Sequence, residues 1–106
     1  MLLPLSPAKE SAVLDVILSS CPPDRAQALA DALVGQQVAA CVSILPGAIS
    51  TYRWQGAVQR DAESLLLVKV PTERRAACLE ALRAAHPYTV PELVVLSAAD
   101  VGASYL

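Results

Sequence analysis

Two side chains in this sequence carry chemistry suited to a transition metal, Cys21 and His86. A thiolate sulfur and an imidazole nitrogen are both good ligands for copper or zinc. A closed structural zinc site uses four ligands. Symmetry-related copies of the chain would therefore have to supply the remaining ligands, or water would complete the shell. The alternative is that His86 caps a helix end, where a donor meets free carbonyl groups. The sequence therefore predicts a metal pair at Cys21 and His86, with helix capping as the competing interpretation.

A second group combines charged and phenolic side chains that are distant in sequence. We expect them to gather at a cleft between subunits and to bind a small anion or a metal; they are Glu63, Lys69, Tyr88 and Glu92. Lys69 lies within an apolar stretch, and an unpaired buried charge is costly. Glu63 or Glu92 is its expected partner, and a plain ion pair at a subunit interface is the competing interpretation.

Tyr52 and Trp54 alternate along a predicted strand, so their rings share one side of a hairpin tip. They would form either a stacking platform for a ligand or an anchor at a subunit interface, where aromatic residues are enriched. Cys41 and Cys78 are expected to be small core residues, because free cysteine is among the most buried residue types.

The composition favours a single self-associating domain. Hydrophobic residues make up 55% of the 106 residues and charged residues only 17%, below the roughly 25% usual for soluble domains. A net charge of −2 argues against a nucleic-acid partner, and no apolar run approaches the ~20 residues of a membrane span. Three cysteines without a Cys-x-x-Cys pair indicate free thiols and a cytoplasmic location.

Hydrophobic periodicity and turn residues predict six elements after a flexible tail at residues 1–12. The domain, 13–106, is expected to contain strands at 13–19, 38–54, 57–70 and 93–96 and helices at 23–36 and 73–85. Pro46 and Gly47 should kink the second strand, and Gln55-Gly56 should form a two-residue hairpin turn. Thr72 is the expected N-cap of the second helix.

The order strand, helix, strand, strand, helix, strand predicts an α+β, ferredoxin-like βαββαβ sandwich with a long β-hairpin. Two helices cover only one face of a four-stranded sheet. Residues 65–68 and 93–96 are nevertheless apolar at consecutive positions, so both faces of their strands need burial. Association of identical chains would bury the uncovered face.

Several segments together resemble the divalent-cation tolerance (CutA) family. They are Val38-Ala39-Ala40-Cys41-Val42 with Leu45-Pro46-Gly47, Ser50-Thr51-Tyr52-Arg53-Trp54-Gln55-Gly56, Glu63 with Lys69, His86-Pro87-Tyr88-Thr89-Val90-Pro91-Glu92, and Tyr105-Leu106. The resemblance implies a homotrimer similar in architecture to PII signalling proteins, whose hairpins pair with neighbouring subunits. It also implies a role in divalent-metal tolerance, with Cu²⁺ or another divalent cation as ligand, no organic cofactor and no enzymatic reaction.

The sequence departs from the family pattern at the copper ligands. Ser20 stands at the expected cysteine position, with Cys21 one residue later, and Ala85-His86 replaces a His-His pair. The chain also ends at Leu106, where the family is expected to continue with a tryptophan-bearing helix.

Three other functions agree less well with the sequence. A PII-like nucleotide sensor, the main alternative, would need a glycine-rich phosphate cradle, and the sequence has four scattered glycines. An RNA-recognition module would display aromatic rings on its central strands, and residues 13–19 and 62–70 contain none. A small hydrolase would need a nucleophile beside a base, and the spacing of the single histidine, His86, from Cys21 or a serine gives no reason to expect such a pair. The sequence therefore favours a binding or scaffold trimer with divalent metal as ligand and a partner protein that it does not identify.

Overall fold

The computed structural model describes residues 13–105. The predicted tail, residues 1–12, and Leu106 lie outside this range. The strands are β1 (Leu14–Cys21), β2 (Cys41–Trp54), β3 (Ala57–Pro71) and β4 (Val94–Ser97). The α-helices are α1 (Ala26–Gly35) and α2 (Arg75–Ala85), and short 3₁₀ turns are η2 (Pro23–Arg25), η3 (Thr72–Arg74) and η4 (Ala103–Tyr105). No helix in the described part of the chain is long and apolar enough to span a membrane.

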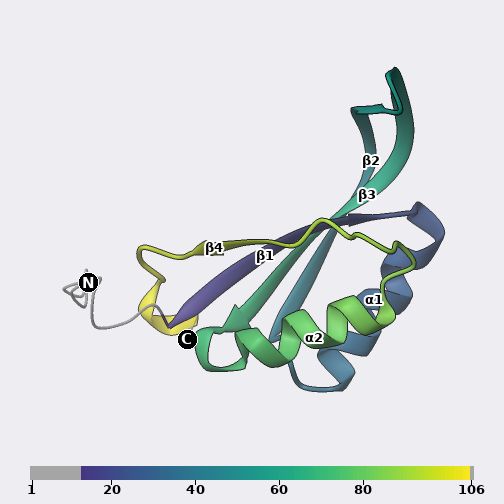
Figure 1. The fold of residues 1–106 in the computed structure, drawn as a ribbon. Helices are drawn as coiled ribbons and strands as arrows, with labels where there is room; N and C mark the ends of the chain where they lie inside the picture. The colour runs from purple at the N-terminus through teal and green to yellow at the C-terminus, as the bar shows by residue number, and fades with distance from the viewer. Residues whose placement is uncertain (1–12, 106) are drawn as a thin grey trace.

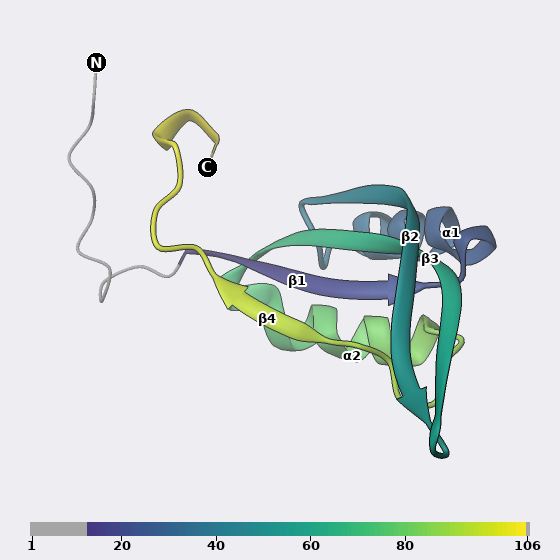
Figure 2. The same cartoon turned by 90° about the horizontal axis from the view of Figure 1, so that it is seen from above.

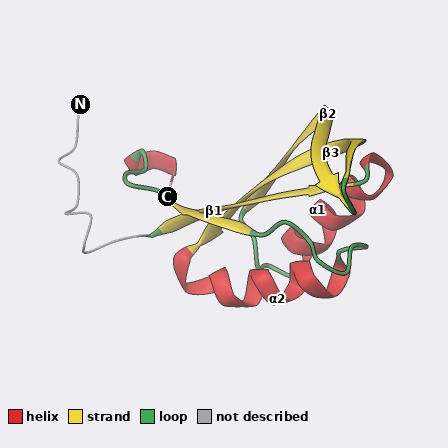
Figure 3. Cartoon of the chain, turned by 45° about the horizontal axis from the view of Figure 1, so that its top comes forward, coloured by secondary structure: helices red, strands yellow, loops and turns green. Residues whose placement is uncertain are grey.

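The four strands form one antiparallel sheet in the order β2-β3-β1-β4, with both helices on one face (Figures 1 and 2). This is the predicted ferredoxin-like arrangement. The central strands are the most apolar, because each is flanked by neighbours on both edges and covered by helices on one face. Figure 3 shows the opposite face without a helical layer.

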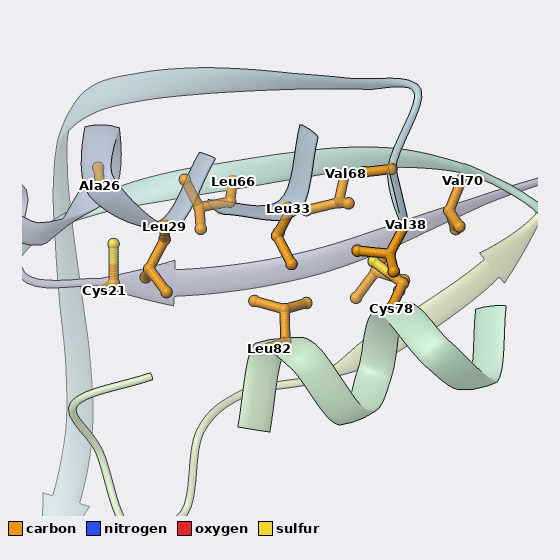
Figure 4. Close-up of a cluster of buried hydrophobic side chains, with 12 residues drawn as sticks. Cys21, Ala26, Leu29, Leu33, Val38, Leu66, Val68, Val70, Cys78 and Leu82 are labelled. Atoms are coloured by element: carbon orange, nitrogen blue, oxygen red, sulfur yellow. The ribbon is translucent and has the colours of Figure 1, made fainter. Parts of the chain in front are cut away.

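The core lies between the helices and the covered face of the sheet (Figure 4). Alternate residues of β1 and β3 point into it, and the predicted stripe of α1 packs onto them. Its fully buried members include Ile17, Leu33, Leu66, Val68, Val70, Cys78 and Leu82. The 3.6-residue periodicity predicted the inward face of the two helices, whereas the near-continuous apolar runs of β1 and β3 did not distinguish their inward from their outward face.

Strands β2 and β3 form one long hairpin that leaves the plane of the sheet (Figures 1 and 2). The pairing register shifts between Leu45 and Ala48, and Gly47 there has φ +85°. The hairpin closes at Gln55 and Gly56, whose φ values of 49° and 80° give the primed turn that matches strand twist. The predicted kink and turn are both present, and they aim the hairpin tip across the end of β1.

The uncovered face of the sheet is largely apolar, with Lys69 and Ser43 on it beside Val16 and Leu67. Its middle is formed by Leu18 of β1 and Leu67 of β3, which are register partners. Around them lie Val16, Leu45, Leu65, Val94 and Leu96, and Leu96 is 52% exposed. We call these seven residues the open face. Exposed apolar patches of this kind usually mark an interaction surface.

The start of α2 differs from the prediction. Thr72 is not a side-chain N-cap, because η3 separates it from the first α-helical residue, Arg75. Its hydroxyl is buried without a hydrogen-bond partner. Its backbone N–H instead donates to the carbonyl of Val13 at 3.1 Å, which ties the helix entry to the beginning of β1.

Asp15 is a charged residue on the core side of β1, and its side chain is 0% exposed. Its Oδ2 accepts from Nη1 of Arg75 at 3.2 Å, while its Oδ1 has no partner among the described residues. A buried carboxylate needs such a cation, since the desolvation of a lone charge is large. Arg75 is therefore the group that makes a charge in the core tolerable.

Candidate functional site

The bent hairpin forms one wall of a pocket of about 480 Å³ at the end of β1. The other walls come from Ser20 of β1 and from the loop that follows α2. Its lining residues are Ser20, Tyr52, Trp54, Asp61, Glu63, Tyr88, Thr89, Val90 and Glu92. Three of the four residues expected at a cleft between subunits, Glu63, Tyr88 and Glu92, therefore line this pocket of one chain, together with both hairpin-tip aromatics, Tyr52 and Trp54.

Each carboxylate of the pocket accepts a hydrogen bond from a hydroxyl on a different element. The phenol of Tyr88 donates to Glu63 Oε2 at 2.7 Å, and the hydroxyl of Ser20 donates to Glu92 Oε1 at 3.0 Å. Tyr52 donates to Asp61, its diagonal neighbour across the hairpin. These bonds hold the hairpin, β1 and the loop after α2 in a fixed relation.

The pKa values of the two phenols are raised, by burial first for Tyr88 and by a hydrogen bond first for Tyr52. Burial, followed by the hydrogen bond and charge of Glu63, raises the pKa of Tyr88 well above its ordinary value. The hydrogen bond to Asp61 is the main reason that the pKa of Tyr52 is also raised. Both phenols therefore remain neutral donors throughout the physiological pH range, and they do not neutralise the carboxylates they contact.

His86 lies next to this pocket, immediately after α2, with its ring buried. Its Nε2 lies 2.8 Å from the carbonyl oxygen of Ser20, and its Nδ1 accepts from the backbone N–H of Tyr88 at 3.1 Å. A carbonyl only accepts and an amide N–H only donates, so the ring is the neutral tautomer protonated at Nε2. The side chain fastens the loop to β1. The same residue is the C-cap of α2, because its backbone N–H donates to the carbonyl of Leu82 at 2.9 Å.

Cys21 is the last residue of β1 and is fully buried in the core. Burial, with smaller contributions from Glu63 and Asp24, raises the pKa of its thiol. Metal binding needs the thiolate and a free imidazole nitrogen. As placed, Cys21 offers a protonated thiol and His86 has both nitrogens engaged, so the pair does not fit a copper site in this arrangement. No group of three or more His, Cys, Asp or Glu residues within 13–105 is placed to hold a metal ion.

Comparison with known proteins matches residues 15–106 to the model of the CutA1 divalent ion tolerance protein family. The chain belongs to this family. The divalent-cation tolerance protein CutA of Thermus thermophilus is 47% identical over 93 residues, which cover 87% of this chain and 90% of that protein. A solved structure from T. thermophilus aligns over 87% of this chain and 90% of its own, with 46% identity and a TM-score of 0.82.

Two further CutA structures are also similar to this chain. One from a Nostoc species, described as a PII-like protein, aligns over 79% of this chain and 80% of its own, with 33% identity and a TM-score of 0.75. Another, from Archaeoglobus fulgidus, is described as a periplasmic divalent cation tolerance protein. It shares 26% identity over 88% of this chain and 91% of its own, with a TM-score of 0.82. The predicted family, that of the divalent-cation tolerance proteins, is confirmed.

Lys69 does not join the pocket of this CutA chain. It pairs with Cys41 in the β2–β3 ladder, and its ammonium donates to the hydroxyl of Ser43. Among the described residues, the ion pairs are Arg75–Asp15 and Arg83–Glu80. Within one chain Lys69 is therefore not paired with Glu63 or Glu92, because six positions along β3 separate Lys69 from Glu63 and the pocket. The ion pair expected at a subunit interface stays a prediction.

Four pocket residues were missing from the sequence prediction, namely Ser20, Asp61, Thr89 and Val90. The position of Asp61 in the pocket could have been predicted from the sequence. Counting back from the turn at Gln55-Gly56 pairs Tyr52 with Gln59, which puts Asp61 on the same side of the hairpin. Ser20 and the loop residues carry no such signal, because only the tertiary packing brings β1 and the loop after α2 to the hairpin.

The prediction that Cys41 is a core residue is wrong. It is the register partner of Lys69, so its side chain is directed to the uncovered side of the sheet and is only partly buried. Cys78 is fully buried as expected, and burial raises the pKa of its thiol. All three cysteines are free.

The different burial of the three cysteines predicts how quickly each thiol is labelled. In the native protein at pH 8, we expect an aromatic disulfide reagent to modify at most one thiol per chain rapidly. Cys21 and Cys78 should react only on unfolding, because they are buried and their raised pKa values keep them protonated. Cys41→Ser should remove any rapid phase. Two rapid thiols in the wild type, or one in the variant, would contradict the structure.

Proposed function

We propose that this chain acts as a homotrimeric binding or scaffold protein in divalent-cation tolerance, with copper or another divalent cation as the metal concerned. The observation that carries the proposal is the open face, a largely apolar surface in the middle of the sheet. Residues 13–105 provide no second layer to bury it. Copies of one chain related by a closed rotation would bury it without another protein.

The hairpin supports the same conclusion. The described part of the chain measures 50 × 27 × 22 Å, and the hairpin projects from one end of it (Figure 1). Its arms carry exposed apolar residues outside the pocket, among them Ile49 and Val58. Paired strands with such side chains are suited to lie against a neighbouring subunit, since exposed apolar strands are otherwise prone to nonspecific association.

The metal enters this proposal through the family and not through a formed site. A cation at Cys21 and His86 would have to displace a backbone partner of the imidazole and deprotonate a buried thiol. That pair therefore stays a prediction. The alternative of a PII-like nucleotide sensor gains no support from the pocket, whose three carboxylates and lack of lining cations would repel phosphate groups. We infer a cytoplasmic location from the free thiols.

Native mass spectrometry with and without Cu²⁺ tests the assembly and the metal together. We expect a species at three times the 11.1 kDa chain mass. If Cys21 and His86 bind copper, the double variant Cys21→Ser/His86→Ala should lose the bound ion while keeping the trimer mass. A single-chain mass would overturn the trimer, and unchanged copper stoichiometry in the variant would remove these two residues from the proposal.

A further inference from the structure

The pocket at the hairpin has a strong charge imbalance. Asp61, Glu63 and Glu92 line it, and none of its lining residues is a lysine, arginine or histidine. Each carboxylate accepts from a neutral hydroxyl, which orients it without supplying a positive charge. Within residues 13–105, no ion pair involves any of the three. The pocket therefore presents an uncompensated negative potential to whatever enters it.

Glu63 is the member that most needs a cation. Its residue is only 6% exposed, yet it lines the pocket. Tyr88 donates to Oε2, whereas Oε1 makes no hydrogen bond within the described chain. A carboxylate with this little exposure is costly to keep charged without a positive partner, and a ligand that enters from the pocket would provide one.

A bare metal ion matches this pocket poorly. The carboxylates are not grouped closely enough to hold one ion together, and about 480 Å³ is far more space than an ion fills. Much of the remaining wall is aromatic, from Tyr52, Trp54 and Tyr88. Ring faces contribute nothing to an oxygen-ligand shell, but they attract ammonium and guanidinium groups and pack against carbon chains.

We propose that this pocket binds a small organic cation, with its ammonium or guanidinium group on Glu63 and its carbon skeleton against the ring of Trp54. Asp61 and Glu92 lie in the same pocket and would receive a second positive group, so a ligand with two charged ends fits best. The inference stands on the pocket within one chain and goes beyond the proposed function, which concerns assembly and metal.

The sequence supplies a built-in reporter, because Trp54 is its only tryptophan and lines the pocket. We would titrate the full-length protein with agmatine, which carries a guanidinium and an ammonium group, and follow tryptophan fluorescence. We expect a saturable change that MgCl₂ at equal ionic strength does not reproduce. No saturation up to about 10 mM, a range that includes even weak specific binding, would overturn the proposal. An absence of saturation would overturn the proposal even if its cause were a cationic side chain of another copy in the pocket.

Substitutions of single carboxylates test whether agmatine binds in this pocket. Glu63→Gln should weaken agmatine binding by at least about tenfold, because a charge-assisted hydrogen bond becomes a neutral one. Glu92→Gln provides a second test should the first variant fold poorly, and we expect the same direction of change. Asp24→Asn, an exposed carboxylate outside the pocket, should leave the affinity within about twofold, since exposed charges interact weakly through solvent. Equal affinities in wild type and both glutamine variants would overturn the proposal.

The mass of the same samples separates this inference from the proposed function. A trimer that does not respond to agmatine overturns the organic-cation site alone. A monomer that binds agmatine through Glu63 overturns the trimer alone.

Discussion

Replacing Arg75 with alanine is expected to destabilise the protein by about 3 kcal/mol, because it leaves the Asp15 carboxylate buried without a counter-ion. The carboxylate is fully buried, whereas the arginine remains partly exposed. The cost therefore falls on Asp15, and the arginine itself gives up little solvation when it is removed. Urea unfolding at a fixed protein concentration measures the loss as a lower transition midpoint at unchanged slope.

Arg83→Ala is the matched control. Arg83 pairs with Glu80 at 3.4 Å on the surface of the same helix, and both side chains are largely exposed. Exposed pairs of this kind contribute about 0.5 kcal/mol or less. Asp15→Asn combined with Arg75→Ala should recover part of the lost stability, since it removes the stranded charge. Similar destabilisation by the Arg75 and Arg83 variants, or no recovery in the double variant, would contradict this account of Asp15.

Placing an aspartate at Leu67 is expected to dissociate the assembly while leaving the fold intact. Leu67 lies in the middle of the open face, paired with Leu18. In a single chain the new carboxylate would remain in contact with water at a partly exposed position. In the proposed trimer it would enter an apolar contact in every subunit, and each unpaired buried charge costs several kcal/mol. The expected result is the single-chain mass of 11.1 kDa by light scattering, with an unchanged circular dichroism spectrum.

Val34→Asp supplies the comparison for this variant. Val34 is a large exposed apolar residue on α1, outside the open face and 44% exposed. A general intolerance of charge at apolar positions would affect both variants, whereas an interface on the open face would affect only Leu67→Asp. Retention of the wild-type mass by Leu67→Asp would mean that the open face is not the assembly surface.

The predicted metal pair shows that residues of a suitable type need not form a metal site in the folded chain. Cys21 and His86 are suitable ligand types, but the fold uses the first as a core residue and the second as a fastener between β1 and the loop after α2. Within one chain, Lys69 donates to Ser43 and does not reach the pocket. The carboxylates of the hairpin pocket are therefore left without a cationic partner among the described residues.

The order of elements followed from the sequence alone. Periodicity of 3.6 placed Leu29 and Leu33 on one side of α1, and near-continuous apolar runs identified β1 and β3. Pro46-Gly47 and Gln55-Gly56 located the bulge and the turn, because Gly47 and Gly56 adopt positive φ values that other residues rarely take. These signals are local: each depends on neighbours a few positions away, so a single sequence displays them directly.

The composition of the site was decided by tertiary structure. The direction in which the bulge turns the hairpin determines that Tyr52 and Asp61 meet Ser20 and Tyr88, and no spacing in the chain encodes that direction. The same applies to Asp15 and Arg75, which are 60 positions apart and form their ion pair only after α2 has packed on the sheet. Contacts between distant segments depend on how whole layers pack, and residue types alone do not specify that packing.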